Sequence, residues 1–146
     1  MTAVIRVLLA DDHSVVREGL RHVLAGDPEL AVVGEAGTGP EAMAMAAAER
    51  PDVVLLDLTM PGAGGLEVLR HVRATLPEIR VLILSVHDDQ EYVLESVRAG
   101  AHGYLRKDSS PAEIRQAIRA VQSAPSMRSC SASVGSTSRA KLPHPT

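Results

Sequence analysis

Six polar side chains in this sequence lie at or beside the ends of short apolar segments, where they could meet and carry out chemistry. They are Asp11, Asp12, Asp57, Ser85, Tyr104 and Lys107. Carboxylates suit a hard divalent cation such as Mg²⁺, and a carboxylate can itself be a nucleophile that forms a covalent intermediate. A lysine adds a compact and mobile positive charge. The ordered set therefore predicts chemistry that uses a divalent cation, a carboxylate nucleophile and a movable cation.

The elements that must position these residues follow from the hydrophobic periodicity of the chain. Apolar, β-branched runs alternate with segments of helical spacing. The runs predict strands at residues 4–10, 31–36, 53–56, 81–84 and 103–105, and the helical segments are 14–25, 41–50, 66–76, 88–99 and 111–121. This alternation predicts an α/β fold, a doubly wound parallel sheet with helices on both faces. Ligands of such sheets bind beyond the carboxyl ends of the strands, so the strand-end residues are expected to converge there.

Local signals mark several helix ends. Thr38 and Glu41 have the spacing of a capping box. The last helix is expected to begin with Ser110 as its cap, Pro111 in the first turn and Glu113 three residues past the cap. Gly100 is suited to end the helix before the fifth strand. The run at 53–56 is apolar at every position, which is typical of a central parallel strand that is covered on both faces.

Length and composition limit the function classes. The 146 residues suit one domain of ordinary size, and the net charge of −3 gives no reason to expect nucleic-acid affinity. One cysteine, Cys130, fits a reducing compartment, and no signal peptide or membrane-length apolar run is present, so a cytoplasmic protein without membrane contact is expected. Residues 123–146 are rich in Ser and Pro and are expected to form a disordered tail behind a domain at 1–122.

Four strings give the chain a resemblance to a known family. LLADDH, VVLLDLTMPG, VLILS and GYLRKD resemble the receiver domain of bacterial two-component response regulators over about residues 4–122. Asp108, rather than Pro, follows Lys107, and this feature with the segment around it is most similar to the NarL/FixJ subfamily. The resemblance implies a flavodoxin-like sheet of five strands in the order 2-1-3-4-5 with five helices.

The resemblance also implies a mechanism for a signalling module that is not an enzyme. Asp57 would take a phosphoryl group from a phosphohistidine of a sensor histidine kinase. The reaction would need Mg²⁺, because phosphoryl transfer concentrates negative charge beside existing carboxylates. Asp12, Asp57 and the backbone carbonyl of Thr59 would bind the ion directly, and Asp11 would bind it through water.

Three further residues would convert phosphorylation into a conformational switch. Lys107 would pair with the phosphoryl oxygens, and Ser85 would donate a hydrogen bond to the same group. Tyr104 would then rotate toward the space that Ser85 vacates. The helix at 88–99 and the strand at 103–106 would present a changed surface to a partner.

The sequence departs from the family pattern in two places. Gly64-Gly65 stands where the family has Asp or Asn before Gly, which predicts a looser loop and a helix cap weaker by a few tenths of a kcal/mol. No helix-turn-helix pattern follows Ser123, so direct nucleic-acid binding is not expected. The resemblance leaves a homodimer, or pairing with a full-length regulator, as the output.

Other interpretations stay open at this level. The chain could be a degenerate receiver that binds a partner without phosphorylation, although the complete residue set argues against this. A Mg²⁺-dependent phosphatase with an aspartate nucleophile would need a second carboxylate two positions on, where this chain has Thr59. The histidines show no metal-ligand pattern and are interpreted as surface or packing residues, with His87 the nearest to the site.

Overall fold

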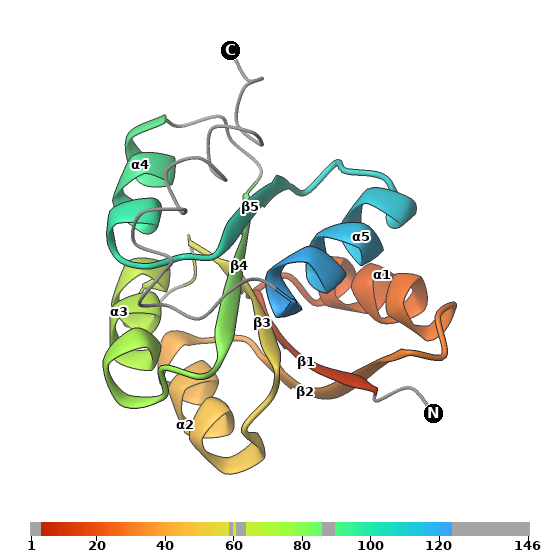
Figure 1. Cartoon of the computed structure of the whole chain (residues 1–146), viewed down its shortest axis with the longest axis horizontal. Coiled ribbons are helices and arrows are strands. Elements are labelled where there is room, and N and C mark those ends of the chain that lie inside the picture. Colours follow the sequence, from red (N-terminus) through yellow and green to blue (C-terminus); the bar gives the residue numbers. More distant parts are fainter. Residues whose placement is uncertain (1–3, 59, 61–63, 86–89, 124–146) are drawn as a thin grey trace.

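The computed structural model describes residues 4–58, 60, 64–85 and 90–123. Within them, parallel strands form one sheet in the order β2-β1-β3-β4-β5 (Figure 1). The strands are β1 (Ile5–Ala10), β2 (Leu30–Ala36), β3 (Val53–Asp57), β4 (Arg80–Ser85) and β5 (Gly103–Arg106). The helices are α1 (Ser14–Ala25), α2 (Gly39–Glu49), α3 (Gly65–Thr75), α4 (Gln90–Arg98) and α5 (Pro111–Gln122). The predicted flavodoxin-like fold and its strand order are confirmed.

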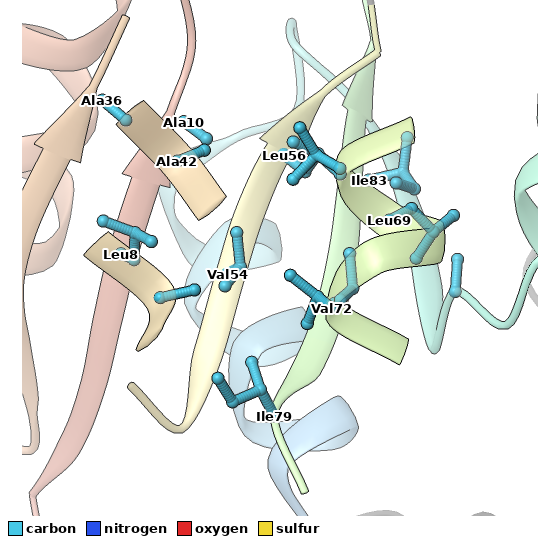
Figure 2. Packing of buried hydrophobic residues seen from close by; sticks show 14 of the residues in the cluster. Leu8, Ala10, Ala36, Ala42, Val54, Leu56, Leu69, Val72, Ile79 and Ile83 are labelled. Atoms are coloured by element: carbon cyan, nitrogen blue, oxygen red, sulfur yellow. The ribbon is translucent and has the colours of Figure 1, made fainter. Parts of the chain in front are cut away.

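Helices cover both faces of the sheet. Helices α1 and α5 lie on one face, and α2, α3 and α4 lie on the other (Figure 1). Strand β3 shows why its run is apolar throughout, because Val53 and Leu55 join the core with α1 and α5, whereas Val54 and Leu56 join the core with α2 and α3. Figure 2 shows the second of these cores, in which Val54 and Leu56 lie among side chains of α2 and α3.

The predicted capping signals hold to different degrees. Ser110 and Glu113 form the full box: the Ser110 hydroxyl accepts from the Glu113 N–H at 3.1 Å, and the Glu113 carboxylate accepts from the Ser110 N–H at 2.9 Å. Thr38 accepts from the Glu41 N–H at 3.3 Å, but the Glu41 carboxylate accepts from the Gly37 N–H instead of completing the box. No helix within the described residues is both long and apolar enough to span a bilayer.

The start of α3 lies against the end of β3. A Cβ atom added at Gly65 would lie 2.3 Å from the Cα of Leu58 and 2.7 Å from the carbonyl oxygen of Asp57. Gly64, which has the positive φ of 82° that favours glycine, gives α3 no side-chain cap, as the sequence predicted. The absence of a side chain at Gly65 therefore lets the first turn of α3 pack against the backbone of Asp57 and Leu58, at the end of β3.

Candidate functional site

Two buried aspartates stand at the carboxyl ends of neighbouring central strands. Asp57 ends β3 and is 1% exposed, and Asp11 follows β1 and is 2% exposed. The Asp11 N–H donates to the carbonyl oxygen of Ala36 at 2.9 Å, which extends the pairing of β1 with β2 by one residue. Burial of ionised carboxylates is costly unless charge or hydrogen bonds compensate it. The two buried carboxylates at this edge of the sheet therefore need positive charge nearby to offset the cost of their burial.

Lys107 supplies part of that charge. Its side chain is 8% exposed, and its Nζ lies 2.7 Å from Asp11 Oδ2 and 3.3 Å from Asp57 Oδ2. Its backbone N–H donates to the carbonyl oxygen of Ser85 at 2.8 Å, which ties the end of β5 to the end of β4. One lysine faces two buried carboxylates and the exposed Asp12 beside them, so the cluster keeps an excess of negative charge.

The donor set suits a divalent cation. Asp11, Asp12, His13 and Asp57 each offer one ligand atom, and these atoms all lie within 4.8 Å of one another. The buried Oδ2 atom of Asp11 meets Lys107 as an ion pair, but makes no hydrogen bond to the described part of the chain. Excess carboxylate oxygen at a solvent-facing edge is the chemistry that Mg²⁺ binds, with water filling its remaining positions. The residues therefore fit the predicted Mg²⁺ ion.

Arg17, which was not among the predicted site residues, holds the loop between β1 and α1. The Arg17 guanidinium donates to the carbonyl oxygen of Asp11 at 2.5 Å, and its Nε donates to Glu35 at 3.1 Å. Glu35 is held in turn by Arg21, whose Nε lies 2.5 Å from the carboxylate. This chain of contacts connects α1, β2 and the backbone of Asp11. No local sequence pattern marks it, because it depends on how α1 packs against β2.

The predicted site residues fall into three groups. The structure brings together Asp11, Asp12, Asp57 and Lys107. Ser85 ends β4 and joins the site through its backbone carbonyl, whereas Tyr104 lies half-buried in β5 opposite Ile83. Thr59 lies outside the described residues, as does His87.

His13 is a surface residue, as predicted, but the prediction that the histidines show no metal-ligand pattern needs correction at this position. Its side chain is exposed, but its Nδ1 lies 3.1 Å from Asp12 Oδ1 and 3.2 Å from Asp11 Oδ1. Its backbone N–H also donates to Asp11 Oδ1 at 2.8 Å. The residue next to the two aspartates in the chain thus belongs to the acidic cluster.

The response regulator receiver domain family profile matches residues 7–119. The chain belongs to the response regulator receiver family. It is 47% identical over 116 residues to the uncharacterized transcriptional regulatory protein YxjL of Bacillus subtilis (strain 168), covering 80% of this chain and 53% of that protein. It is 45% identical over 117 residues to the DNA-binding transcriptional activator DevR/DosR of Mycobacterium tuberculosis, covering 80% of this chain and 54% of that protein. The receiver thus spans about half the length of these curated relatives.

Solved structures agree with the assignment. The signal receiver domain of the putative response regulator NarL from Mycobacterium tuberculosis has a TM-score of 0.81 at 38% identity, covering 84% of this chain and 99% of that one. A LuxR-family two-component response regulator from Aurantimonas has a TM-score of 0.78 at 42% identity, covering 82% of this chain and 86% of that one. The predicted similarity to NarL/FixJ-type receivers is confirmed.

Proposed function

We propose that Asp57 accepts a phosphoryl group from the phosphohistidine of a sensor histidine kinase, in a Mg²⁺-dependent reaction that switches a protein-interaction surface. The observation that carries the proposal is the pair of buried aspartates around one lysine at the carboxyl edge of the sheet. A structural ion pair would need one acid for one base, whereas this cluster keeps more acid than Lys107 can balance. Membership of the receiver family supports the same conclusion.

The transfer reaction uses Asp57 as the nucleophile. One carboxylate oxygen of Asp57 forms a bond to phosphorus while the bond from phosphorus to the kinase imidazole nitrogen breaks. The electron pair of the broken bond stays with the imidazole, and the product is an acyl phosphate on Asp57. Asp11, Asp12 and Asp57 would hold Mg²⁺, with Asp11 acting through water and the Thr59 carbonyl as a further ligand. Bound Mg²⁺ would offset the negative charge that gathers on the phosphoryl oxygens.

Lys107 would exchange partners during this reaction. Its Nζ now lies between Asp11 and Asp57, and a phosphoryl group on Asp57 would offer oxygens with more charge. Because the Lys107 N–H donates a hydrogen bond to the Ser85 carbonyl, movement of the lysine would also shift the ends of β4 and β5. Ser85 would then donate to the phosphoryl group, and Tyr104 would rotate toward it. The face formed by α4 and β5 would change shape.

The proposed output is pairing of receiver domains. A second phosphorylated copy, or the receiver of a full-length regulator, would bind the changed face, and residues 1–122 would make no direct contact with nucleic acid. Light scattering with Mg²⁺ and beryllofluoride, a phosphate mimic, measures this directly. A mimic-dependent rise to the mass of a dimer that Asp57→Asn lacks is expected. A monomer with the mimic bound would contradict homodimer formation.

The experiment that tests the proposed function is phosphorylation by a small-molecule donor such as phosphoramidate, followed by intact mass. We expect one phosphoryl group per chain with Mg²⁺, little without it, and none in Asp57→Asn. Asp108→Asn is the matched control, because Asp108 is exposed and pairs with Arg106 outside the cluster. Uptake by Asp57→Asn would refute the assignment of the acceptor. Rapid turnover without retained phosphate would favour a phosphatase, and no uptake by the wild-type chain would favour a degenerate receiver.

A further inference from the structure

His13 is placed to take part in metal binding rather than only to begin α1. As the N-cap residue of α1 it makes no side-chain cap, so its imidazole is not engaged with the helix. Its Nδ1 instead lies 3.2 Å from Asp11 Oδ1 and 3.1 Å from Asp12 Oδ1. The side chain is 60% exposed, so an ion can reach it from solvent. The imidazole therefore faces the same space as the carboxylates.

The spacing of these atoms is that of neighbouring ligands around one ion. Bonds of about 2.1 Å in an octahedral shell place adjacent ligand atoms about 3 Å apart. The two distances from the imidazole nitrogen have this length, and an oxygen of Asp57 lies within 4.8 Å of the same group. His13 can thus contribute one nitrogen, and Asp12 and Asp57 one oxygen each, to a single centre that Asp11 joins through water.

We propose that this receiver binds Mn²⁺, Co²⁺ or Ni²⁺ through His13 together with the aspartates, and binds these ions more tightly than Mg²⁺. The inference rests on the proposed function, because it concerns the same cation site. Imidazole nitrogen is a ligand that first-row transition metals favour, and affinity rises from Mn²⁺ to Ni²⁺. Mg²⁺ prefers oxygen ligands and water, so it gains little from the imidazole. His13 would therefore determine which ion occupies the site.

A purely orienting role for His13 makes a different prediction. In that role the ring would only donate a hydrogen bond to the carboxylates and so keep them in place. Asn at position 13 preserves such a donor and is a favourable N-cap residue, but it lacks the imidazole nitrogen. His13→Asn therefore separates ligation from orientation without removing the helix start. His22→Asn is the matched control, because His22 is an exposed histidine in the last turn of the same helix.

The test is isothermal titration calorimetry of the full chain with Mg²⁺ and with Ni²⁺ at one fixed pH. In His13→Asn we expect the Kd for Ni²⁺ to rise at least tenfold and the Kd for Mg²⁺ to change less than twofold. His22→Asn should bind both ions with the Kd values of the wild-type chain, and Asp12→Ala should weaken the binding of both ions. Unchanged Ni²⁺ binding in His13→Asn, or an equal loss for both ions, would overturn the inference.

The same titrations separate this inference from the proposed function. If Mg²⁺ binds the wild-type chain and this binding depends on Asp12, the cation site of the proposed function is supported, whether or not His13 is a ligand. If the chain binds Ni²⁺ with no dependence on Asp12, the ion sits elsewhere and the inference fails. If Mg²⁺ does not bind and phosphoryl uptake needs no divalent ion, the metal requirement of the proposed function fails, and the inference fails with it.

Discussion

A fall in pH from 7 to 5 should destabilise the folded domain through His102, at the opposite edge of the sheet from the acidic cluster. His102 precedes β5, and its Nδ1 accepts a hydrogen bond of 3.0 Å from the Val81 N–H. Its backbone N–H donates to the Val81 carbonyl at 2.8 Å, so His102 connects the beginnings of β4 and β5. The acceptor nitrogen must be unprotonated to receive this bond. Burial, with Arg73 and Arg80 nearby, lowers the pKa of His102 from 6.5 to about 4.

The sign and size of the effect follow from this pKa. A histidine whose pKa is lower in the folded state than in the unfolded state stabilises the fold at pH values above the unfolded-state pKa of 6.5. This contribution is lost as the pH falls from 6.5 toward the folded-state pKa of about 4. At pH 5 most unfolded chains carry the charged imidazole and most folded chains do not. The linkage relation gives a loss of about 2 kcal/mol between pH 7 and 5, with almost none above pH 7.

Urea unfolding followed by circular dichroism at pH 7 and pH 5 measures this loss. The variant His102→Asn keeps an acceptor for the Val81 N–H but does not titrate, so its stability should fall by about 2 kcal/mol less over the same pH interval. His71→Asn, at an exposed position of α3, should behave like the wild-type chain. Equal pH dependence of the wild-type chain and His102→Asn would refute the reasoning.

Other substitutions test the parts of the site that position Asp11 and Asp57. Arg17→Gln removes the donor to the Asp11 carbonyl and should weaken Mg²⁺ binding about tenfold in calorimetry. Arg21→Gln removes an ion pair with Glu35 and should leave Mg²⁺ binding unchanged. Gly65→Ala would force a Cβ against the backbone at the end of β3 and should cost about 2 kcal/mol in urea unfolding. At Gly19 of α1, the described residues outside the helix backbone place no atom within 4 Å of an added Cβ, so Gly19→Ala should stabilise α1 by up to about 1 kcal/mol. An equal effect of the two changes would contradict the close approach at Gly65.

The sequence predicted the parts of the fold that depend on local pattern. The continuous apolar run of β3 predicted a central strand, because a strand that is buried on both faces needs apolar side chains at every position. The full capping box at Ser110 and Glu113 followed from their spacing and residue types. The convergence of Asp11, Asp57 and Lys107 followed from the rule that parallel strands place their carboxyl ends at one edge.

The features that the sequence could not predict depend on side-chain directions and on packing between distant segments. Arg17 reaches the Asp11 backbone only because α1 lies against β2, where Glu35 holds the guanidinium. The sequence does not show that His13 joins the acidic cluster, because residue spacing does not determine where an imidazole points. Glu41 has the spacing of a capping box, yet its carboxylate accepts a hydrogen bond from the Gly37 N–H instead of the Thr38 N–H.

Backbone NMR of the full chain with Mg²⁺ and beryllofluoride tests whether modification of Asp57 changes the face formed by α4 and β5. Comparison of the wild-type chain with Asp57→Asn shows whether a phosphoryl mimic at Asp57 drives the switch. We expect large amide shifts at Ser85, Tyr104 and Lys107 in the wild-type chain and none in the variant. Shifts of equal size in Asp57→Asn, or a wild-type spectrum in which only residues beside Asp57 respond, would contradict this expectation.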